Sequence, residues 1–207
     1  MDVFQEVKTG TTVMGVQFKG GVVLGADSRT SMGSYVANRV SDKISPVSDK
    51  IMICRSGSAA DTQAISDYVQ YFLENYSMET GQPPSVHNAA HMARNICYEY
   101  KDHLSAALIV GGMDSTGPSL YSIPLGGALV KQPIAIGGSG SSFIYGYVDA
   151  NFREDMSEEE AIEFVKNSVS LAMTRDGSSG GIIRIAIITS DRTERLLFAG
   201  RDVPRFQ

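Results

Sequence analysis

The sequence predicts an α+β fold built in layers, with two antiparallel sheets packed against each other between pairs of helices. The first observation behind this prediction is the order of the expected elements along the 207 residues: strands, two helices, strands, two helices, strands. A regular alternation of strand and helix would instead indicate a parallel sheet. The second is the periodicity, because short runs rich in β-branched residues alternate with stretches whose apolar residues recur every three or four positions.

The first two expected strands form a hairpin. Residues 13–18 and 21–26 are both strand-like, and Lys19-Gly20-Gly21 joins them with the residue types of a tight turn. Later strands are expected over residues 51–54, 107–110, 119–123, 134–136, 182–189 and 195–199.

The first pair of helices is expected in the first half of the chain. Ser58 with Asp61 resembles an N-terminal cap, and helical spacing continues to residue 79. A second helix is expected from Pro84-Ser85 to about His103. The residues expected to face inward in the two helices are Ile65, Val69, Phe72, Leu73, Tyr76, Ala89, Met92, Ile96 and Cys97.

The second pair of helices is expected near Ser142, where a short helix begins, and at Ser157. Ser157 and Glu160 have the spacing of a capping box. Ile162, Val165, Val169 and Met173 then form the apolar stripe of that helix. The glycine-serine stretches 137–142 and 177–181 lie between apolar runs and are short, so we interpret them as tight loops and expect no domain boundary there.

Composition excludes several classes of protein. The chain is 43% hydrophobic and 20% charged, with a net charge of -5 and dispersed basic residues, so nucleic acid is not an expected partner. The only cysteines, Cys54 and Cys97, indicate a reducing compartment and no disulfide framework. No apolar stretch is long enough to span a membrane, and residues 1–10 have no apolar core of a secretory signal.

Metal and cofactor motifs are weak. His87 and His91 are four residues apart on an expected helix, but the intervening sequence lacks the glutamate of a zinc-protease helix, so two ordinary histidines are expected. Gly138-Ser-Gly140 follows a strand, but neither a third glycine nor Gly-Lys-Ser/Thr comes after it. We therefore expect neither a metal nor a cofactor.

Gly10-Thr11 is a candidate processing site. Cleavage between these residues would leave a threonine with a hydroxyl and a free α-amine, whose ordinary pKa is about 7.7–8. One residue could then supply both a nucleophile and its base. The dipeptide alone is a weak signal.

Three polar segments could complete such a site. Asp27 ends the second expected strand, where it could simply lie at the surface. Lys43 stands between apolar neighbours and is either a charge on an edge strand or a partly buried lysine held by a carboxylate such as Asp27. Arg55 and Gly57 lie between a strand and a helix, where a glycine can offer its N–H to an anion and an arginine is often simply solvated.

Taken together, these segments resemble the β subunits of the eukaryotic proteasome, and more narrowly their caspase-like type, which cuts after acidic residues. The motifs that carry the resemblance are residues 11–12, 25–29, 38–43, 54–62, 135–142 and 175–181. It extends from Thr11 to about Phe198. It implies an N-terminal-nucleophile hydrolase with a four-layer αββα sandwich, a prosegment at 1–10 and a single catalytic domain at 11–207.

The resemblance also implies roles for individual residues. Thr11 is the nucleophile, Asp27 and Lys43 form the charged pair beside it, and Gly57 helps to hold the oxyanion. A further set, which orients the new N-terminus, comprises Ser139, Asp176 and Ser179. The specificity pocket has Arg55 at its base, with Thr30, Ser41 and Thr62 nearby.

The activity implied is that of a threonine endopeptidase that cuts unfolded or ubiquitin-targeted polypeptides after acidic residues in cytoplasm and nucleus. Its implied partners are other proteasome α and β subunits in stacked rings. Two alternatives remain: a ring subunit of the same fold without catalysis, and a free-standing amidase of the same superfamily. Loss of the Gly-Thr junction or of the lysine would favour the first, and this chain keeps both.

Overall fold

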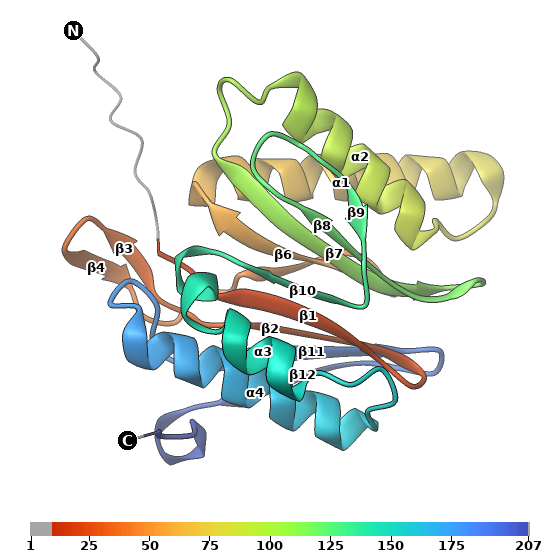
Figure 1. The fold of residues 1–207 in the computed structure, drawn as a ribbon. Helices are drawn as coiled ribbons and strands as arrows, with labels where there is room; N and C mark the ends of the chain where they lie inside the picture. The colour runs from red at the N-terminus through yellow and green to blue at the C-terminus, as the bar shows by residue number, and fades with distance from the viewer. Residues whose placement is uncertain (1–9, 207) are drawn as a thin grey trace, which may run out of the picture.

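The computed structural model describes residues 10–206 and consists of four stacked layers (Figure 1). Two sheets lie face to face in the middle. Helices α1 (Ala59–Thr80) and α2 (Val86–Glu99) cover one outer face, and α3 (Tyr145–Asn151) and α4 (Glu158–Arg175) cover the other. The α+β fold expected from the sequence, an αββα sandwich, is confirmed.

The first sheet has the strand order β10-β1-β2-β11-β12, and every neighbouring pair is antiparallel. The expected hairpin has the boundaries that the sequence predicted. The strands are β1 (Val13–Phe18), β2 (Gly21–Ala26), β10 (Ile134–Gly137), β11 (Ile183–Thr189) and β12 (Thr193–Phe198). Because Val13 pairs with Ala26, the start of β1 and the end of β2 meet at one edge of this sheet.

The second sheet has the order β5-β6-β7-β8-β9 and is also antiparallel. Its strands are β5 (Ile44–Ser48), β6 (Ile51–Gly57), β7 (Ala106–Asp114), β8 (Gly117–Ile123) and β9 (Val130–Lys131). A separate hairpin comprises β3 (Thr30–Met32) and β4 (Tyr35–Asn38). Strands β3, β4, β5 and β9 were not predicted from the sequence. Strand β5 lies at the edge of this sheet and contains Pro46 beside a register shift. Proline has no N–H to donate, and an edge strand tolerates that loss.

The helix starts follow their local signals. The Ser58 side chain accepts the N–H of Asp61, and Ser157 and Glu160 form a complete capping box. Helix α2 ends at Glu99 rather than near His103, because the chain turns at residues 100–103. The expected short helix near Ser142 is a 3-10 turn over Ser139–Phe143 followed by α3, and another 3-10 turn spans Gly200–Asp202.

The core has one apolar layer between the sheets and one beneath each helix pair. On α1 the inward face is formed by Ile65, Val69 and Leu73, which are almost completely buried. The expectation that Phe72 and Tyr76 also face inward was wrong, since they are 43% and 39% exposed. The stripe at intervals of four residues already fills the contact with the sheet, and Phe72 lies about a quarter-turn of the helix away from it.

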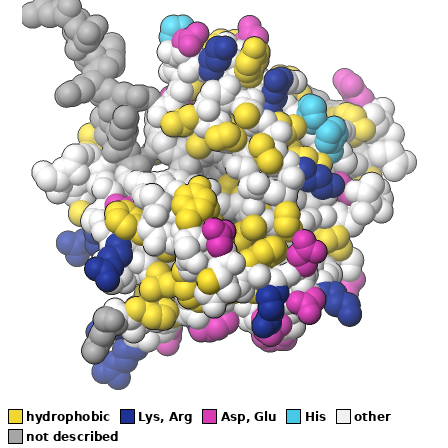
Figure 2. Space-filling model, viewed as in Figure 1, with side chains coloured by type: hydrophobic (Ala, Val, Ile, Leu, Met, Phe, Trp, Pro, Cys, Tyr) yellow, Lys and Arg dark blue, Asp and Glu magenta, His cyan; other side chains and the backbone are white. Residues whose placement is uncertain are grey.

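The surface in Figure 2 shows lysine and arginine side chains dispersed among acidic ones. Within residues 10–206, no helix combines the length and the apolar character of a membrane span. Cys54 and Cys97 are buried and unpaired. Burial raises the pKa of both thiols, that of Cys97 to about 11, so both are protonated near neutral pH and act as core side chains.

Candidate active site

Thr11 lies just before β1 at the edge where the ends of several elements meet. It is 3% exposed, and its Oγ1 donates to the Gly10 carbonyl oxygen at 2.7 Å. Its backbone N–H donates to Ser139 Oγ at 3.1 Å. Because Gly10 and Thr11 are still joined, the threonine nitrogen is an amide nitrogen in this structure.

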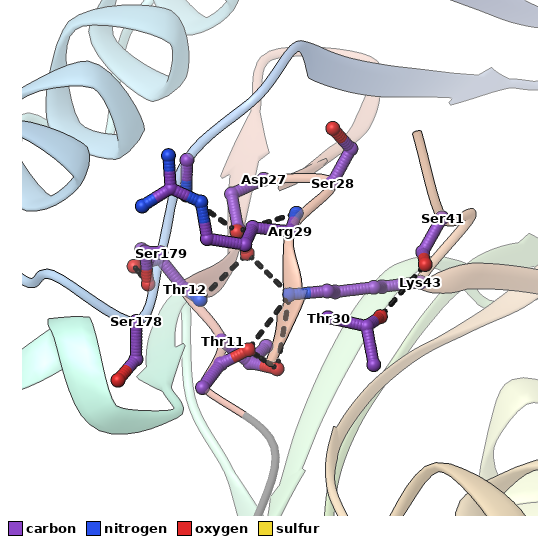
Figure 3. A network of polar contacts seen from close by, with 12 residues as sticks. Thr11, Thr12, Asp27, Ser28, Arg29, Thr30, Ser41, Lys43, Ser178 and Ser179 are labelled. Carbon is purple, nitrogen blue, oxygen red and sulfur yellow. Dashed lines mark hydrogen bonds and ion pairs between the residues drawn. The ribbon is translucent and has the colours of Figure 1, made fainter. Parts of the chain in front are cut away.

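Lys43 connects the threonine to a carboxylate (Figure 3). Its Nζ donates to Thr11 Oγ1 at 3.1 Å, to the Gly10 carbonyl oxygen at 3.0 Å and to Asp27 Oδ1 at 2.8 Å. An ammonium has three donors, so each has an acceptor. Burial lowers the pKa of Lys43, while the charge and the hydrogen bond of Asp27 act in the opposite direction. Lys43 is only 6% exposed, so it is a buried lysine and not a solvated charge on an edge strand.

Asp27 is completely buried and is held by the backbone on both sides. Its carboxylate accepts the N–H groups of Thr12 at 2.9 Å, Arg29 at 3.0 Å and Gly180 at 2.9 Å, in addition to Lys43. Removing an ion pair from water is costly, and such hydrogen bonds offset part of that cost. The antiparallel pairing of β1 with β2 brings Asp27 to Thr12, so the hairpin itself builds this part of the site.

A second carboxylate supports the backbone nitrogen of Thr11. Asp176, directly after α4, accepts the hydroxyls of Ser139 and Ser179, both at 2.6 Å, and the N–H of Ser178 at 3.0 Å. Burial alone would raise the pKa of Asp176, but these three hydrogen bonds, together with the charge of Lys43, outweigh it and hold the pKa below its ordinary value. Asp176 is therefore an ionised acceptor that fixes the serine next to the Thr11 nitrogen.

A cavity of about 220 Å³ opens beside Thr11. It brings together seven of the residues singled out in the sequence: Thr11, Thr30, Ser41, Lys43, Arg55, Gly57 and Thr62. Gly57 ends β6 with φ +105, and a Cβ there would lie 2.2 Å from the Ser105 carbonyl oxygen. Only glycine permits this backbone path beside the cavity.

Among the described residues that line the cavity, Arg55 is the only arginine. One Nη donates to the Asp42 carbonyl oxygen at 2.6 Å, and its Nε is buried with no hydrogen-bond partner among the described residues. Burial lowers the pKa of Arg55, and Asp42 acts in the opposite direction. The hydroxyls of Thr30 and Ser41 lie 2.7 Å apart, so they are already paired with each other.

Comparison with known proteins identifies the family to which this chain belongs. The model of the family described as proteasome subunits matches residues 7–188. The chain belongs to the proteasome subunit family. It is 58% identical over 195 residues to a probable proteasome subunit beta type-1 of Schizosaccharomyces pombe, covering 94% of this chain and 86% of that protein.

Other relatives have the same kind of name. The chain is 57% identical over 194 residues to proteasome subunit beta type-1 of Saccharomyces cerevisiae, covering 93% of this chain and 90% of that protein. It is 54% identical over 201 residues to proteasome subunit beta type-6 of Dictyostelium discoideum, covering 97% and 94%. The chain is a β subunit of the proteasome core, a component of a protease, and such subunits assemble with other α and β subunits in stacked rings.

The site of this proteasome subunit has two sides. Ser178 and Ser179 lie on one side of Thr11, and Thr30 and Ser41 lie on the other (Figure 3). Ser139, Asp176 and Ser179 do not line the cavity, so the structure separates the support of the Thr11 nitrogen from the pocket.

Arg29 and Asp42 also contribute to the site, although neither was among the site residues inferred from the sequence. Arg29 donates from its side chain to the Gly177 carbonyl oxygen at 2.9 Å and so ties the loop before Ser179 to the end of β2. Asp42 lines the cavity next to Lys43. Both residues lie inside motifs that carry the resemblance, 25–29 and 38–43. Their position within those motifs could have identified them as site residues.

The paired histidines lie away from this site. His87 and His91 lie side by side on α2, with ring centroids 4.1 Å apart and the ring planes tilted by 51°, and His87 Nδ1 lies 3.4 Å from the Tyr121 hydroxyl. Across the part of the chain that the structure describes, no group of three or more His, Cys, Asp or Glu side chains is arranged to hold a metal ion.

Proposed function

We propose that this proteasome β subunit is a threonine endopeptidase with Thr11 as its nucleophile. The observation that carries the proposal is the position of Lys43 Nζ, 3.1 Å from Thr11 Oγ1 and 2.8 Å from Asp27. A cation at this distance favours the negative charge that develops on the hydroxyl oxygen as it loses its proton. A ring subunit without catalysis would have no use for this arrangement.

The proposed prosegment, residues 1–10, keeps the enzyme inactive as a zymogen; residues 1–9 lie outside the described part of the chain. While Gly10 is bonded to Thr11, the nitrogen is an amide and cannot act as a base. After cleavage it becomes an α-amine beside Ser139 and can take the Oγ1 proton. Asp176 and Ser179 hold that serine in place.

The proposed reaction then follows the general course of acyl transfer. The Thr11 oxygen attacks the substrate carbonyl carbon, and the resulting oxyanion accepts hydrogen bonds, for which Gly57 N–H is the proposed donor. Collapse breaks the C–N bond, and the leaving nitrogen takes the proton from the α-amine. Water then hydrolyses the ester on Thr11 with the same amine as base, which regenerates the enzyme.

Processing provides the first test. We expect the subunit isolated from assembled, active particles to begin at Thr11, because only then is the α-amine free. N-terminal sequencing and intact mass of the subunit measure this directly. An active particle in which the subunit still carries Gly10 would contradict the proposed role of the α-amine.

We further propose that the subunit cuts after acidic residues of unfolded or ubiquitin-targeted polypeptides, in cytoplasm and nucleus. Support comes from Arg55, whose side chain lines the cavity, donates to a neutral carbonyl oxygen and has an Nε without a hydrogen-bond partner among residues 10–206. A substrate carboxylate can provide charge-assisted and bidentate hydrogen bonds to it. An apolar side chain would leave the charge unpaired, so attraction and penalty both favour acidic residues.

Replacing Arg55 with leucine tests this preference. A hydrogen bond to a charged group contributes about 1.5–3 kcal/mol, so kcat/KM for an acidic peptide should fall about ten- to a hundredfold. Cleavage of a matched peptide with a branched apolar residue should rise. The control is Arg153→Leu, which removes a cation from the exposed region before α4. If the ratio of kcat/KM values, acidic over apolar peptide, is unchanged in the Arg55→Leu particle, Arg55 does not determine the preference.

A further inference from the structure

The segment that carries Ser41, Asp42 and Lys43 leads into β5 of the second sheet. Two arginines from the first sheet, on β11 and β12, hold it in place. Arg184 of β11 donates to the Val40 carbonyl oxygen at 3.0 Å. Arg195 of β12 forms an ion pair with Asp42 Oδ1 at 2.7 Å. The same Oδ1 accepts the N–H of Ile44 at 3.1 Å, so the orientation of the Asp42 carboxylate is set from two directions.

Asp42 is also a neighbour of the proposed specificity residue. Its carbonyl oxygen accepts the Arg55 guanidinium at 2.6 Å, and both residues line the cavity beside Thr11. The negative charge of Asp42 reaches Arg55, because it raises the pKa of the guanidinium against the effect of burial. Within residues 10–206, however, Arg55 forms no direct ion pair, whereas the Asp42 carboxylate is paired with Arg195.

A carboxylate at this position would be harmful to the recognition of acidic substrates if it had no partner of its own. It could turn toward Arg55 and occupy the donors that a substrate carboxylate needs. It would also repel that carboxylate, since like charges in one cavity disfavour each other. Arg195 removes both effects by holding and neutralising Asp42 at the side of the cavity.

We propose that Arg195 is a specificity-determining residue that acts through Asp42, keeping the Arg55 guanidinium available to an acidic substrate side chain. The inference rests on the proposed preference for acidic residues. Arg195 does not touch the substrate and is a positioning residue. Its charge is what matters, beyond its mechanical attachment to the segment that ends in Lys43.

The test compares two peptides that differ only in the residue before the cut, glutamate or leucine, in assembled particles. Arg195→Gln should lower the ratio of kcat/KM values, glutamate over leucine, about two- to fivefold, the range expected of a partly exposed charge pair. The fall should lie in the glutamate peptide and should shrink as salt is raised. Adding Asp42→Asn to Arg195→Gln should restore the ratio, because the unpaired carboxylate is then gone.

Arg184→Gln is the matched control. It removes a neighbouring cation that is attached to the same segment through a neutral carbonyl oxygen, so the ratio should stay unchanged. An equal loss for both peptides in Arg195→Gln, or a double variant that does not recover, would overturn the inference and leave Arg195 a purely mechanical anchor.

The outcome also separates this inference from the function on which it rests. If the unaltered particle, with this subunit as its only active one, does not favour the glutamate peptide, the proposed specificity fails and the role of Arg195 fails with it. If the unaltered particle favours glutamate and Arg195→Gln keeps the same ratio, only the role of Arg195 is contradicted.

Discussion

Replacing Thr11 with alanine is expected to abolish the peptidase activity of this subunit and to leave its fold and assembly intact. The variant lacks the nucleophile, and loss of the nucleophile reduces turnover on the order of 10⁶-fold in a well-studied hydrolase. The structural cost is small, because Lys43 keeps its contacts with Asp27 and the Gly10 carbonyl oxygen. The two hydrogen bonds of Thr11 Oγ1 that are lost correspond to about 1 kcal/mol each.

The measurement is hydrolysis of a fluorogenic peptide with glutamate before the cut, by assembled particles whose other catalytic subunits are inactivated. Thr80→Ala is the matched control, since that hydroxyl is exposed and bonds to the backbone of its own helix. Native particle size shows whether assembly has been preserved. Activity that persists in fully assembled Thr11→Ala particles would rule out Thr11 as the nucleophile.

Exchange of Lys43 for arginine is expected to remove most of the turnover even though the charge is kept. The ammonium occupies a buried position between three oxygens at 2.8–3.1 Å, and a planar guanidinium cannot place its donors there. The lysine ammonium is also a compact point charge whose pKa responds to its surroundings, here lowered by burial, whereas the larger guanidinium stays charged. We expect kcat to fall about 10²- to 10³-fold, the range for loss of one group that stabilises charge in the transition state.

The control for this exchange is Lys50→Arg. Lys50 is also partly buried and donates to the Thr189 carbonyl oxygen at 3.1 Å, but it lies outside the cavity. Its exchange should leave kcat close to normal. The two variants are compared in single-subunit kinetics with KM determined separately, because loss of a contact made only in the transition state appears in kcat. A near-normal kcat for Lys43→Arg would exclude Lys43 from the chemistry.

Local signals in the sequence predicted the parts of the fold that depend on local interactions. The hairpin of β1 and β2 has a glycine turn between two apolar runs, and α4 begins at a capping box contained within four residues. Strands β4 and β9 are short and are defined by the partners they meet in the folded chain. Periodicity within such short segments does not distinguish a strand from a loop.

The site shows the same division. From residue types alone, Lys43 could be an edge charge or a buried partner of Asp27, and the resemblance to a family assigned the second role. The 2.8 Å contact shows that the two side chains meet. The ion pair between Asp42 and Arg195 joins positions 153 residues apart, and no motif or spacing in the sequence predicts it. Contacts of that kind arise from the packing of the sheets and require the three-dimensional structure.

The support of Thr11 comes from parts of the chain that are synthesised late. Its nitrogen is held by Ser139, 128 residues downstream, and Asp27 accepts the N–H of Gly180. A nascent chain that contains only the first half of the sequence therefore lacks both Ser139 and Gly180. In such a chain nothing holds the Thr11 nitrogen, and the Asp27 carboxylate lacks one of its hydrogen bonds. The hydrogen bonds around Thr11 therefore cannot all form in a nascent chain that ends before Gly180, so the proposed site is completed only after most of the polypeptide has left the ribosome.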